Sequence, residues 1–203
     1  MQALRSKDMK VDIECVAVVD MPTIYSATPF RAHSFIAQDG IEHMALVSPL
    51  TAQRPLVRMH SECLTGDAFG SLRCDCGPQL QASLKRFAEN GGILIYLRGH
   101  EGRGIGLANK MRAYALQDQG LDTVEANLAL GLPEDGRDYA PAAQILRHLG
   151  HSQVRLLTNN PEKVLGLQRY GIEVVGTETL ITPPNPFNAA YLQTKARKFG
   201  HFL

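Results

Sequence analysis

The sequence predicts an α/β protein, a single layered domain with a mixed β-sheet flanked by helices. Short apolar strands alternate with amphipathic helices through most of the chain, which is the order typical of such layered folds. Ile93–Leu97 is almost wholly apolar, as expected of a strand that helices cover on both faces. The 203 residues are enough for one sizeable core, and we therefore assign residues 1–203 to one domain.

The individual elements follow from local patterns in chain order. Two half-buried strands are expected at His43–Ser48 and Leu56–Glu62, separated by the proline-containing segment Leu50–Pro55. Pro78 then occupies the first turn of a helix over Gln79–Glu89, whose apolar residues recur on one face. After the strand at 93–97, the remaining expected elements are a helix over Gly106–Gln119, a helix over Ala140–Leu149, a strand over Val154–Leu157, a helix after Pro161, a strand over Ile172–Val175 and a helix over Asn188–Phe199.

Composition and charge narrow the class of protein. Hydrophobic residues make up 44% of the chain and charged residues 20%, and the formal net charge is +1. This balance provides no broad electrostatic surface for nucleic acid or for a membrane, so we expect neither as a partner. The sequence has no long apolar run and no apolar export segment near residue 1, and its cysteines are clustered and unpaired. These features predict a cytoplasmic location, where thiols stay reduced.

Three of the four cysteines, Cys63, Cys74 and Cys76, lie in one short window. Thiolate sulfur is a preferred ligand of Zn²⁺, and a catalytic zinc site has three protein ligands and an open fourth position for water. The spacing therefore favours an open three-ligand zinc site. Two alternatives remain: a closed structural site with His60 as the fourth ligand, and reduced cysteines that bind no metal.

A glycine-rich segment, Arg98–Leu107, lies between the apolar strand and the next predicted helix. Its four glycines permit close backbone approach, and the following helix offers unpaired N–H groups to an anion. Arg98 and Arg103 add forked donors suited to phosphate oxygens. The segment is neither a Walker A loop nor a Rossmann fingerprint. Because the carboxylate of Glu101 would repel phosphate, we interpret it as an acceptor for a base such as guanine, or as a partner that neutralises an arginine.

Two more polar segments are candidate binding loops, Leu132–Tyr139 and Leu157–Lys163. The second places hydroxyl and amide groups at a strand end and a lysine in the first turn of a helix, which suits an anion or the edge of a base. Both segments also fit ordinary turn and helix-cap chemistry, with Asp138 capping the helix that follows it. Taken alone, neither segment distinguishes the two interpretations.

Taken together, the motifs resemble those of the GTP cyclohydrolase II family, whose members open the purine ring of GTP at the first committed step of riboflavin synthesis. The resemblance runs in order from about Val57 to the C-terminus, and residues 1–50, expected to form N-terminal strands, match only loosely. It is carried by the segments Arg58–Asp67, Ser71–Gly77, Glu101–Leu107, Arg112–Gly120, Asp122–Asn127 and Leu156–Lys163.

The resemblance implies a role for each matching position. The three clustered cysteines would hold one catalytic zinc per chain. Asp135 would be a proton acceptor, Arg137 the nucleophile toward the α-phosphate, and Tyr114 an active-site tyrosine. The expected GTP-binding residues are Arg58, Met59, His60, Ser61, Glu62, Gln79, Glu101, Gly102, Arg103, Thr123, Thr158 and Lys163. The resemblance also suggests a homodimer.

Two residues depart from the family pattern without removing a functional group. Gly136 stands where some members have a larger residue, which raises the question of whether the loop around it keeps its closed geometry. His100 precedes the Glu-Gly-Arg motif where glutamine is common.

The implied chemistry is physically reasonable, with one difficulty. Zinc-activated water can attack the imidazole ring at neutral pH, with Tyr114 or His60 as a nearby hydrogen-bond partner. Loss of pyrophosphate needs cationic clamps and usually a divalent ion, for which Mg²⁺ is suited. A guanidinium stays protonated, however, so Arg137 would either lose its proton to Asp135 during attack or act only as a charge clamp.

Two other functions compete with a GTP cyclohydrolase II. One is a paralogue of the same fold that binds GTP but stops at the formamide or supplies another pathway. The other is a zinc-knuckle protein that binds nucleic acid, against which stand the net charge of +1 and an aromatic content of only 6%.

Overall fold

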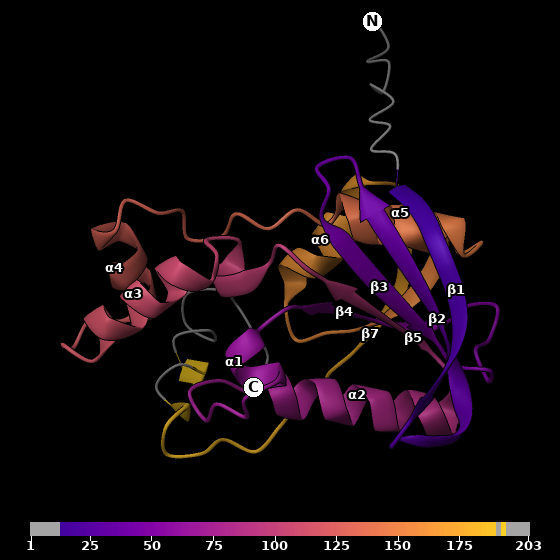
Figure 1. Cartoon of the computed structure of the whole chain (residues 1–203), viewed down its shortest axis with the longest axis horizontal. Helices are drawn as coiled ribbons and strands as arrows, with labels where there is room; N and C mark the ends of the chain where they lie inside the picture. Colours follow the sequence, from indigo (N-terminus) through magenta and orange to yellow (C-terminus); the bar gives the residue numbers. More distant parts are fainter. Residues whose placement is uncertain (1–12, 190–191, 194–203) are drawn as a thin grey trace, which may run out of the picture.

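The computed structural model describes residues 13–189 and 192–193, and these form a layered α/β domain around one mixed sheet (Figure 1). The order of the seven strands across the sheet is β1 (Ile13–Thr23), β2 (Ser26–Ala37), β3 (Glu42–Val47), β5 (Ile93–Leu97), β4 (Leu56–Ser61), β6 (Gln153–Leu157) and β7 (Glu173–Glu178). Neighbours from β1 to β5 pair antiparallel, and β5, β4, β6 and β7 pair parallel. The predicted fold class is confirmed.

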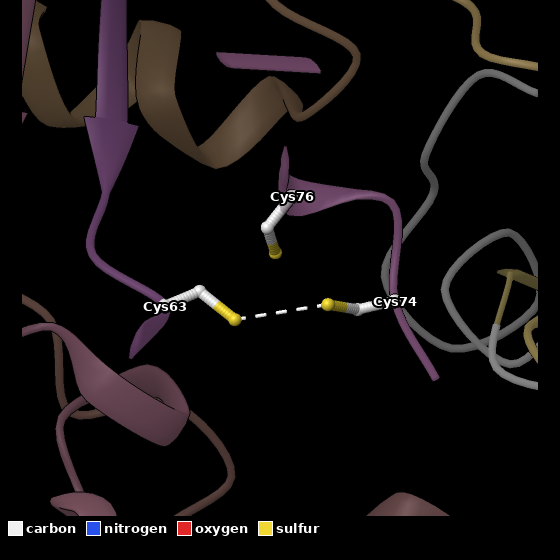
Figure 2. A group of neighbouring side chains, drawn as sticks. All are labelled: Cys63, Cys74 and Cys76. Atoms are coloured by element: carbon white, nitrogen blue, oxygen red, sulfur yellow. Dashed lines mark hydrogen bonds between the residues drawn. The ribbon is translucent and has the colours of Figure 1, made fainter. Parts of the chain in front are cut away.

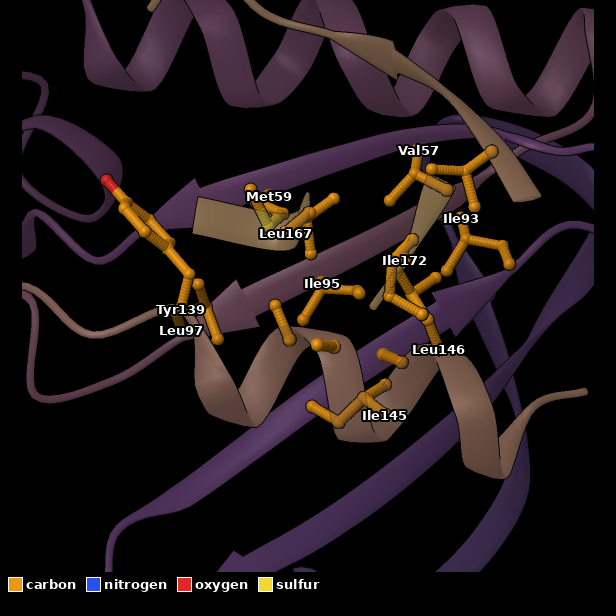
Figure 3. Packing of buried hydrophobic residues seen from close by; sticks show 14 of the residues in the cluster. Val57, Met59, Ile93, Ile95, Leu97, Tyr139, Ile145, Leu146, Leu167 and Ile172 are labelled. Atoms are coloured by element: carbon orange, nitrogen blue, oxygen red, sulfur yellow. The ribbon is translucent and has the colours of Figure 1, made fainter. Parts of the chain in front are cut away.

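Helices cover both faces of this sheet, and the alternation of side chains along the strands supplies two cores. On one face α2 (Cys76–Asn90) packs Leu84 and Phe87 against Leu94. On the other face α5 (Ala140–His148) and α6 (Pro161–Arg169) pack against Ile93 and Ile95, as Figure 3 shows. Residues 93 to 97 point alternately to the two faces, so an apolar residue is needed at almost every position of β5.

Most predicted elements are present, with bounds that shift by a few residues. The helix expected from Gln79 begins earlier, at Cys76, and the one expected over 106–119 is α3 (Leu107–Gln117). The strand at Leu56–Glu62 was expected to be half-buried, and this is wrong, because β4 is buried from Leu56 through His60. A central strand lies between two helical layers, so even its polar side chains are enclosed.

Several elements were not located from the sequence. They are the short helix α1 (Leu64–Asp67), the 3₁₀ turn η1 (Glu101–Arg103) and the helix α4 (Thr123–Ala129). Strands were expected within residues 1–50, but the bounds of the long β1–β2 hairpin were not predicted. The signal for α4 was present in the sequence: Asp122 caps the helix and Glu125 completes a capping box. The helix expected over Asn188–Phe199 falls largely on residues outside those that the structure describes.

The strand order creates an opening in the sheet between β4 and β6. The chain leaves β4 through α2 toward β5, then returns through α5 on the opposite face to β6, on the other side of β4. A reversal of this kind leaves a crevice at the carboxyl ends of the strands. β4 and β6 pair only at Leu56 and Val57, so the two strands separate from Arg58 onward.

Within the described ranges, no helix combines the length and apolar character needed to cross a membrane.

We expect Ile95→Ala to lower the free energy of unfolding by about 2–5 kcal/mol, because it leaves a cavity in a fully buried part of the core. Ile24→Ala is the matched control, since Ile24 is 93% exposed, and its effect should stay within about 0.5 kcal/mol. Urea unfolding of both variants measures the difference. Equal stabilities would contradict the assignment of Ile95 to the core.

Candidate active site

Three cysteine sulfurs converge where α1 meets the start of α2 (Figure 2). The ligand atoms of Cys63, Cys74 and Cys76 all lie within 4.8 Å of one another, and the first two sulfurs are 3.7 Å apart. Sulfurs bound to one tetrahedral zinc at about 2.3 Å would be separated by about 3.8 Å. The cluster therefore has the spacing of a metal site, and the cysteines are free thiols with no disulfide.

Glycines make the convergence of the three sulfurs possible. A Cβ atom on Gly66 would lie 2.8 Å from the sulfur of Cys74 and 3.2 Å from that of Cys63. A Cβ atom on Gly77 would lie 2.3 Å from the carbonyl oxygen of Gly66. Any side chain at either position would push the cysteine loops apart, so the residues present fit a bound metal ion.

A buried carboxylate holds the first cysteine in place. Asp67 accepts hydrogen bonds from the backbone N–H of Cys63 at 3.0 Å, from the Tyr96 hydroxyl at 2.8 Å and from His60 Nε2 at 3.0 Å. Burial lowers the pKa of His60 despite this carboxylate, so its ring is neutral. Because Nε2 donates to Asp67 and His60 is outside the cluster of ligand atoms among the described residues, the closed site with His60 as fourth ligand is wrong.

The thiols of the cluster differ in acidity. The pKa of Cys63 is lowered because Cys74 and Cys76 donate hydrogen bonds to it and the ammonium of Lys110 lies nearby. The pKa of Cys74 is raised to about 11, chiefly because its proton is held by the sulfur of Cys63. One sulfur of the cluster is therefore ready to act as an anionic ligand before any metal arrives.

Glu101 lies beside this cluster and is paired with a lysine. Its Oε1 accepts from Lys110 Nζ at 2.6 Å, and its Oε2 accepts from the backbone N–H of Leu64 at 2.7 Å. The suggestion that it neutralises an arginine is not supported, because its ion-pair partner among the described residues is Lys110. Each carboxylate oxygen can accept a second hydrogen bond, so contact with guanine stays a prediction.

The glycine-rich loop packs directly on the segment that contains Asp135 and Arg137. The N–H of Gly136 donates to the carbonyl oxygen of Arg103 at 2.9 Å. A Cβ atom at Gly104 would lie 3.1 Å from the carbonyl carbon of Gly136, so only glycine allows this approach. Arg103 itself has a φ of +66°, a strained backbone conformation for a residue with a side chain. The loop is closed by its backbone, which answers the question raised by Gly136.

Arg137 is held by the carboxylate of Asp135. Arg137 Nε donates to Asp135 Oδ1 at 2.9 Å, and Nη2 donates to Oδ2. The hydrogen bonds and positive charge of Arg137 lower the pKa of Asp135 although burial opposes this, so the carboxylate is ionised. The guanidinium also lies over the ring of Tyr139, 5.8 Å from its centroid. The Asp135 carboxylate therefore fixes the orientation of the Arg137 guanidinium, and the guanidinium is the group of this pair that suits a phosphate.

His100 connects the end of β4 to the segment that contains Asp135 and Arg137, which we call the arginine loop. Its Nε2 lies 2.9 Å from the carbonyl oxygen of Asp138, which can only accept, so Nε2 carries the proton. Nδ1 then accepts from the Ser61 hydroxyl at 3.1 Å, and the Ser61 oxygen accepts from Arg137 Nη1 at 3.4 Å. Burial and the nearby charge of Arg137 lower the pKa of His100 to about 3, so it is neutral. A glutamine could make the same two hydrogen bonds, which explains why either residue is acceptable here.

Two cations span the opening between β4 and β6. Arg58 Nη1 donates to the carbonyl oxygen of Leu157 at 3.1 Å, and its Nη2 donates to Gln79. Lys163 Nζ donates to the carbonyl oxygen of Met59 at 2.7 Å. Their positive charges lie at the carboxyl ends of parallel strands, where such folds bind anions.

These groups line one open cleft. The sequence-predicted residues that line it are Arg58, His60, Ser61, Glu62, Cys63, Cys74, Cys76, Gln79, Glu101, Gly102, Arg103, Tyr114, Arg137, Thr158 and Lys163. Asp135 is paired with Arg137, which lines the cleft, and Thr123 is the first residue of α4. The side chain of Met59 packs in the core, and its backbone carbonyl accepts from Lys163.

Sequence analysis did not identify His100 or Lys110 as contacts of this cleft, and it included Asn159 and Asn160 only within the candidate binding loop Leu157–Lys163. Lys110 precedes Tyr114 by one helical turn, so the two lie on the same face of α3, but its sequence context does not distinguish it from a surface lysine. A contact of Asn160 with the cleft is hard to recognise from the sequence, because its side chain also caps α6 by accepting from the N–H of Glu162.

Fold and site together define an α/β protein with a three-cysteine cluster that could hold a metal ion, beside a cationic cleft suited to a phosphorylated ligand. The chain matches the family model described as GTP cyclohydrolase II over residues 14–179, which includes the N-terminal hairpin. The chain therefore belongs to the GTP cyclohydrolase II family, a family of hydrolases.

Several curated proteins are similar to this chain over nearly its whole length. It is 53% identical over 197 residues to a GTP cyclohydrolase-2 of Streptomyces coelicolor, covering 96% of this chain and 88% of that protein. It is 55% identical to a riboflavin biosynthesis protein RibBA of Salinispora arenicola and 54% identical to one of Thermotoga maritima, covering 94% and 92% of this chain. The chain spans only 46% and 48% of the length of those two RibBA proteins.

We expect His100→Gln to retain kcat/KM within a factor of about three, because the amide can replace both ring hydrogen bonds. His100→Leu keeps the volume but removes both bonds, and misplacement of the arginine loop should lower kcat/KM by roughly 10-fold to 100-fold. Steady-state kinetics of the two purified variants makes the comparison. Equal losses in both would show that the ring itself is required and not its two hydrogen bonds.

Proposed function

We propose that this protein is a GTP cyclohydrolase II that acts in riboflavin biosynthesis. It hydrolyses the imidazole ring of GTP and releases formate and pyrophosphate, giving 2,5-diamino-6-hydroxy-4-(5-phosphoribosylamino)pyrimidine. The observation that carries the proposal is the convergence of three cysteine sulfurs at a cleft lined by Arg103, Arg137 and Lys163, in a member of this family. The cluster suits reaction at the base, and the cations suit the triphosphate.

The three cysteines would hold one zinc ion per chain. Their sulfur-to-sulfur spacing and the glycine contacts around them support this. Zinc bound there would supply an activated water for hydrolysis at C8 of the purine. Tyr114 lines the same cleft, and its hydroxyl would act as a hydrogen-bond partner during ring opening. His60 is less suited to that role, because its Nε2 proton is committed to Asp67.

Different residues would contact the base and the triphosphate of the substrate. At the base end, Glu101 would accept from the guanine N1–H and 2-amino group with its remaining lone pairs. At the phosphate end, Arg103, Arg137 and Lys163 would bind the triphosphate, with Mg²⁺ as its counter-ion. Thr158 lies at the end of β6 beside Lys163 and would contact the same group.

Arg137 is better suited to a charge clamp than to a nucleophile. Its guanidinium is engaged by the ionised carboxylate of Asp135 through two parallel hydrogen bonds, which stabilise the protonated form. A nucleophilic nitrogen would require that this pair lose a proton, and Asp135, with its pKa lowered, is a poor base. We propose that Asp135 orients Arg137 and that the guanidinium stabilises the negative charge that develops as pyrophosphate leaves.

A cytoplasmic location and a homodimeric state complete the proposal. Free thiols in a metal-binding cluster are consistent with a reducing compartment. The long edge strand β1 exposes apolar side chains, including Val16 and Val19, and a second copy of the chain could cover them.

The decisive test is incubation with GTP, Mg²⁺ and trace zinc, with products identified by mass and with formate and pyrophosphate assayed. We expect both products from GTP and essentially none from ATP. Cys74→Ser should abolish formate release, because the metal loses a thiolate ligand. Cys15→Ser is the matched control, since Cys15 lies on β1, and its activity should equal that of the wild type. A formamide as the final product would identify the paralogue that stops early.

The variant Arg137→Lys distinguishes the two possible roles of Arg137, charge clamp and nucleophile. The lysine keeps the charge but loses the fork, so we expect pyrophosphate release to slow by roughly 10-fold to 100-fold without being abolished. Rapid-quench measurement of pyrophosphate and formate in the same samples gives the two rates. Complete loss of pyrophosphate release, together with a nucleotide adduct trapped on the wild-type arginine, would instead establish Arg137 as the nucleophile.

A further inference from the structure

Lys110 is a buried cation in direct contact with the metal-binding cluster. Its side chain is 9% exposed, and its Nζ lies 3.1 Å from the sulfur of Cys63. The same ammonium donates to the Thr65 hydroxyl at 3.0 Å and to Glu101 Oε1 at 2.6 Å. All three N–H donors of the ammonium therefore have an acceptor, and one of these acceptors is a predicted metal ligand.

The charge expected of the metal-bound cluster explains why the cation Lys110 lies beside Cys63. Three thiolates and one Zn²⁺ would form a unit with a net charge of −1, and two of the three cysteines, Cys63 and Cys74, are buried. A buried charge of this kind is costly unless a partner neutralises it. The ammonium of Lys110 supplies the opposite charge at the sulfur itself, and Glu101 fixes the direction in which the ammonium points.

Other residues on the face of α3 that carries Lys110 contact the loop that contains Cys74. Lys110, Tyr114 and Asp118 follow one another at intervals of one helical turn. Asp118 pairs with Arg73, the residue before Cys74, and the Arg73 guanidinium lies 4.7 Å from the centroid of the Tyr114 ring. Lys110 Nζ lies 5.6 Å from that centroid. Tyr114 is thus held between two cations, each linked to a different cysteine loop.

We propose that Lys110 is a positioning residue of the metal centre. Its N–H···S hydrogen bond to Cys63 balances the surplus charge of the trithiolate site, and its place on α3 holds Tyr114 beside that site. The inference rests on the proposed zinc site, and it assigns to Lys110 a contribution to metal affinity and to the electronic state of one sulfur. Outer-sphere partners of this type commonly change metal affinity by about 10-fold to 100-fold.

The test replaces Lys110 and measures metal binding directly. Lys110→Met alone would leave Glu101 as a buried carboxylate without its counter-ion, so the double variant Lys110→Met/Glu101→Gln is made in parallel. Circular dichroism and thermal melting establish that each variant is folded. Zinc affinity is measured by competition with a chromophoric chelator, and Co²⁺ is bound to the same site to record its sulfur-to-metal charge-transfer absorption.

Both variants should bind zinc at least about tenfold more weakly than the wild type. Loss of the N–H···S hydrogen bond raises the energy of the sulfur lone pairs, so the charge-transfer absorption of the Co²⁺ protein should move to longer wavelength. Lys163→Met is the matched control, because it removes another buried lysine of the same cleft whose ammonium donates to the Met59 carbonyl. Its zinc affinity and its Co²⁺ spectrum should both match those of the wild type.

Two results would overturn the inference in different ways. Wild-type affinity and an unshifted absorption in folded Lys110 variants would leave the zinc site intact and remove Lys110 from it. Wild-type protein that binds neither zinc nor Co²⁺ at the cysteines would overturn the proposed metal site itself, and with it this role of Lys110. A loss of affinity without any spectral shift would assign Lys110 to the packing of α3 alone and contradict its contact with the sulfur.

Discussion

The separation of β4 from β6 is the constraint on which the rest of the structure depends. The two strands pair only through Leu56 and Val57, after which the backbone groups of β4 on that side lose their sheet partners. Buried backbone carbonyls need donors, and Arg58 and Lys163 provide them at Leu157 and Met59. Two cations thus bridge the gap, and they also place positive charge in the cleft. A fully paired sheet would have neither the opening nor a reason to bury these charges.

Beyond this opening, buried polar groups link each loop of the site to a strand. Asp67 joins α1 to β4 and β5 through His60 and Tyr96, and it fixes Cys63 by a backbone bond. His100 joins the end of β4 to the arginine loop through Ser61. Buried carboxylates and imidazoles are tolerated only when they are hydrogen-bonded, so each pair specifies one loop position. The loops carry the chemistry, and these pairs give them the rigidity of the sheet.

The sequence predicted the parts of this arrangement that depend on local patterns. Ile93–Leu97 was placed without error because a strand covered on both faces must be apolar at nearly every position, and Pro78 marked the first turn of α2. The three cysteines were predictable from ligand chemistry and spacing. Burial of β4 was not, because Arg58 and His60 make its sequence alternate like a half-exposed strand. Their burial is explained only by partners such as Leu157 and Asp67, which lie on other elements.

Lys110 shows where local reading of the sequence reaches its limit. In sequence it is one more lysine on an amphipathic helix, where a solvent-exposed position is the ordinary expectation. Its burial results from three acceptors on two other segments, Cys63, Thr65 and Glu101. The Glu101 carboxylate, which is out of place in a phosphate-binding loop, makes physical sense once this ammonium is beside it. The cleft then has two electrostatic ends, one around the cysteine cluster and Lys110 and the other around Arg137. In the proposed function, a nucleotide would present its base to the first end and its phosphates to the second.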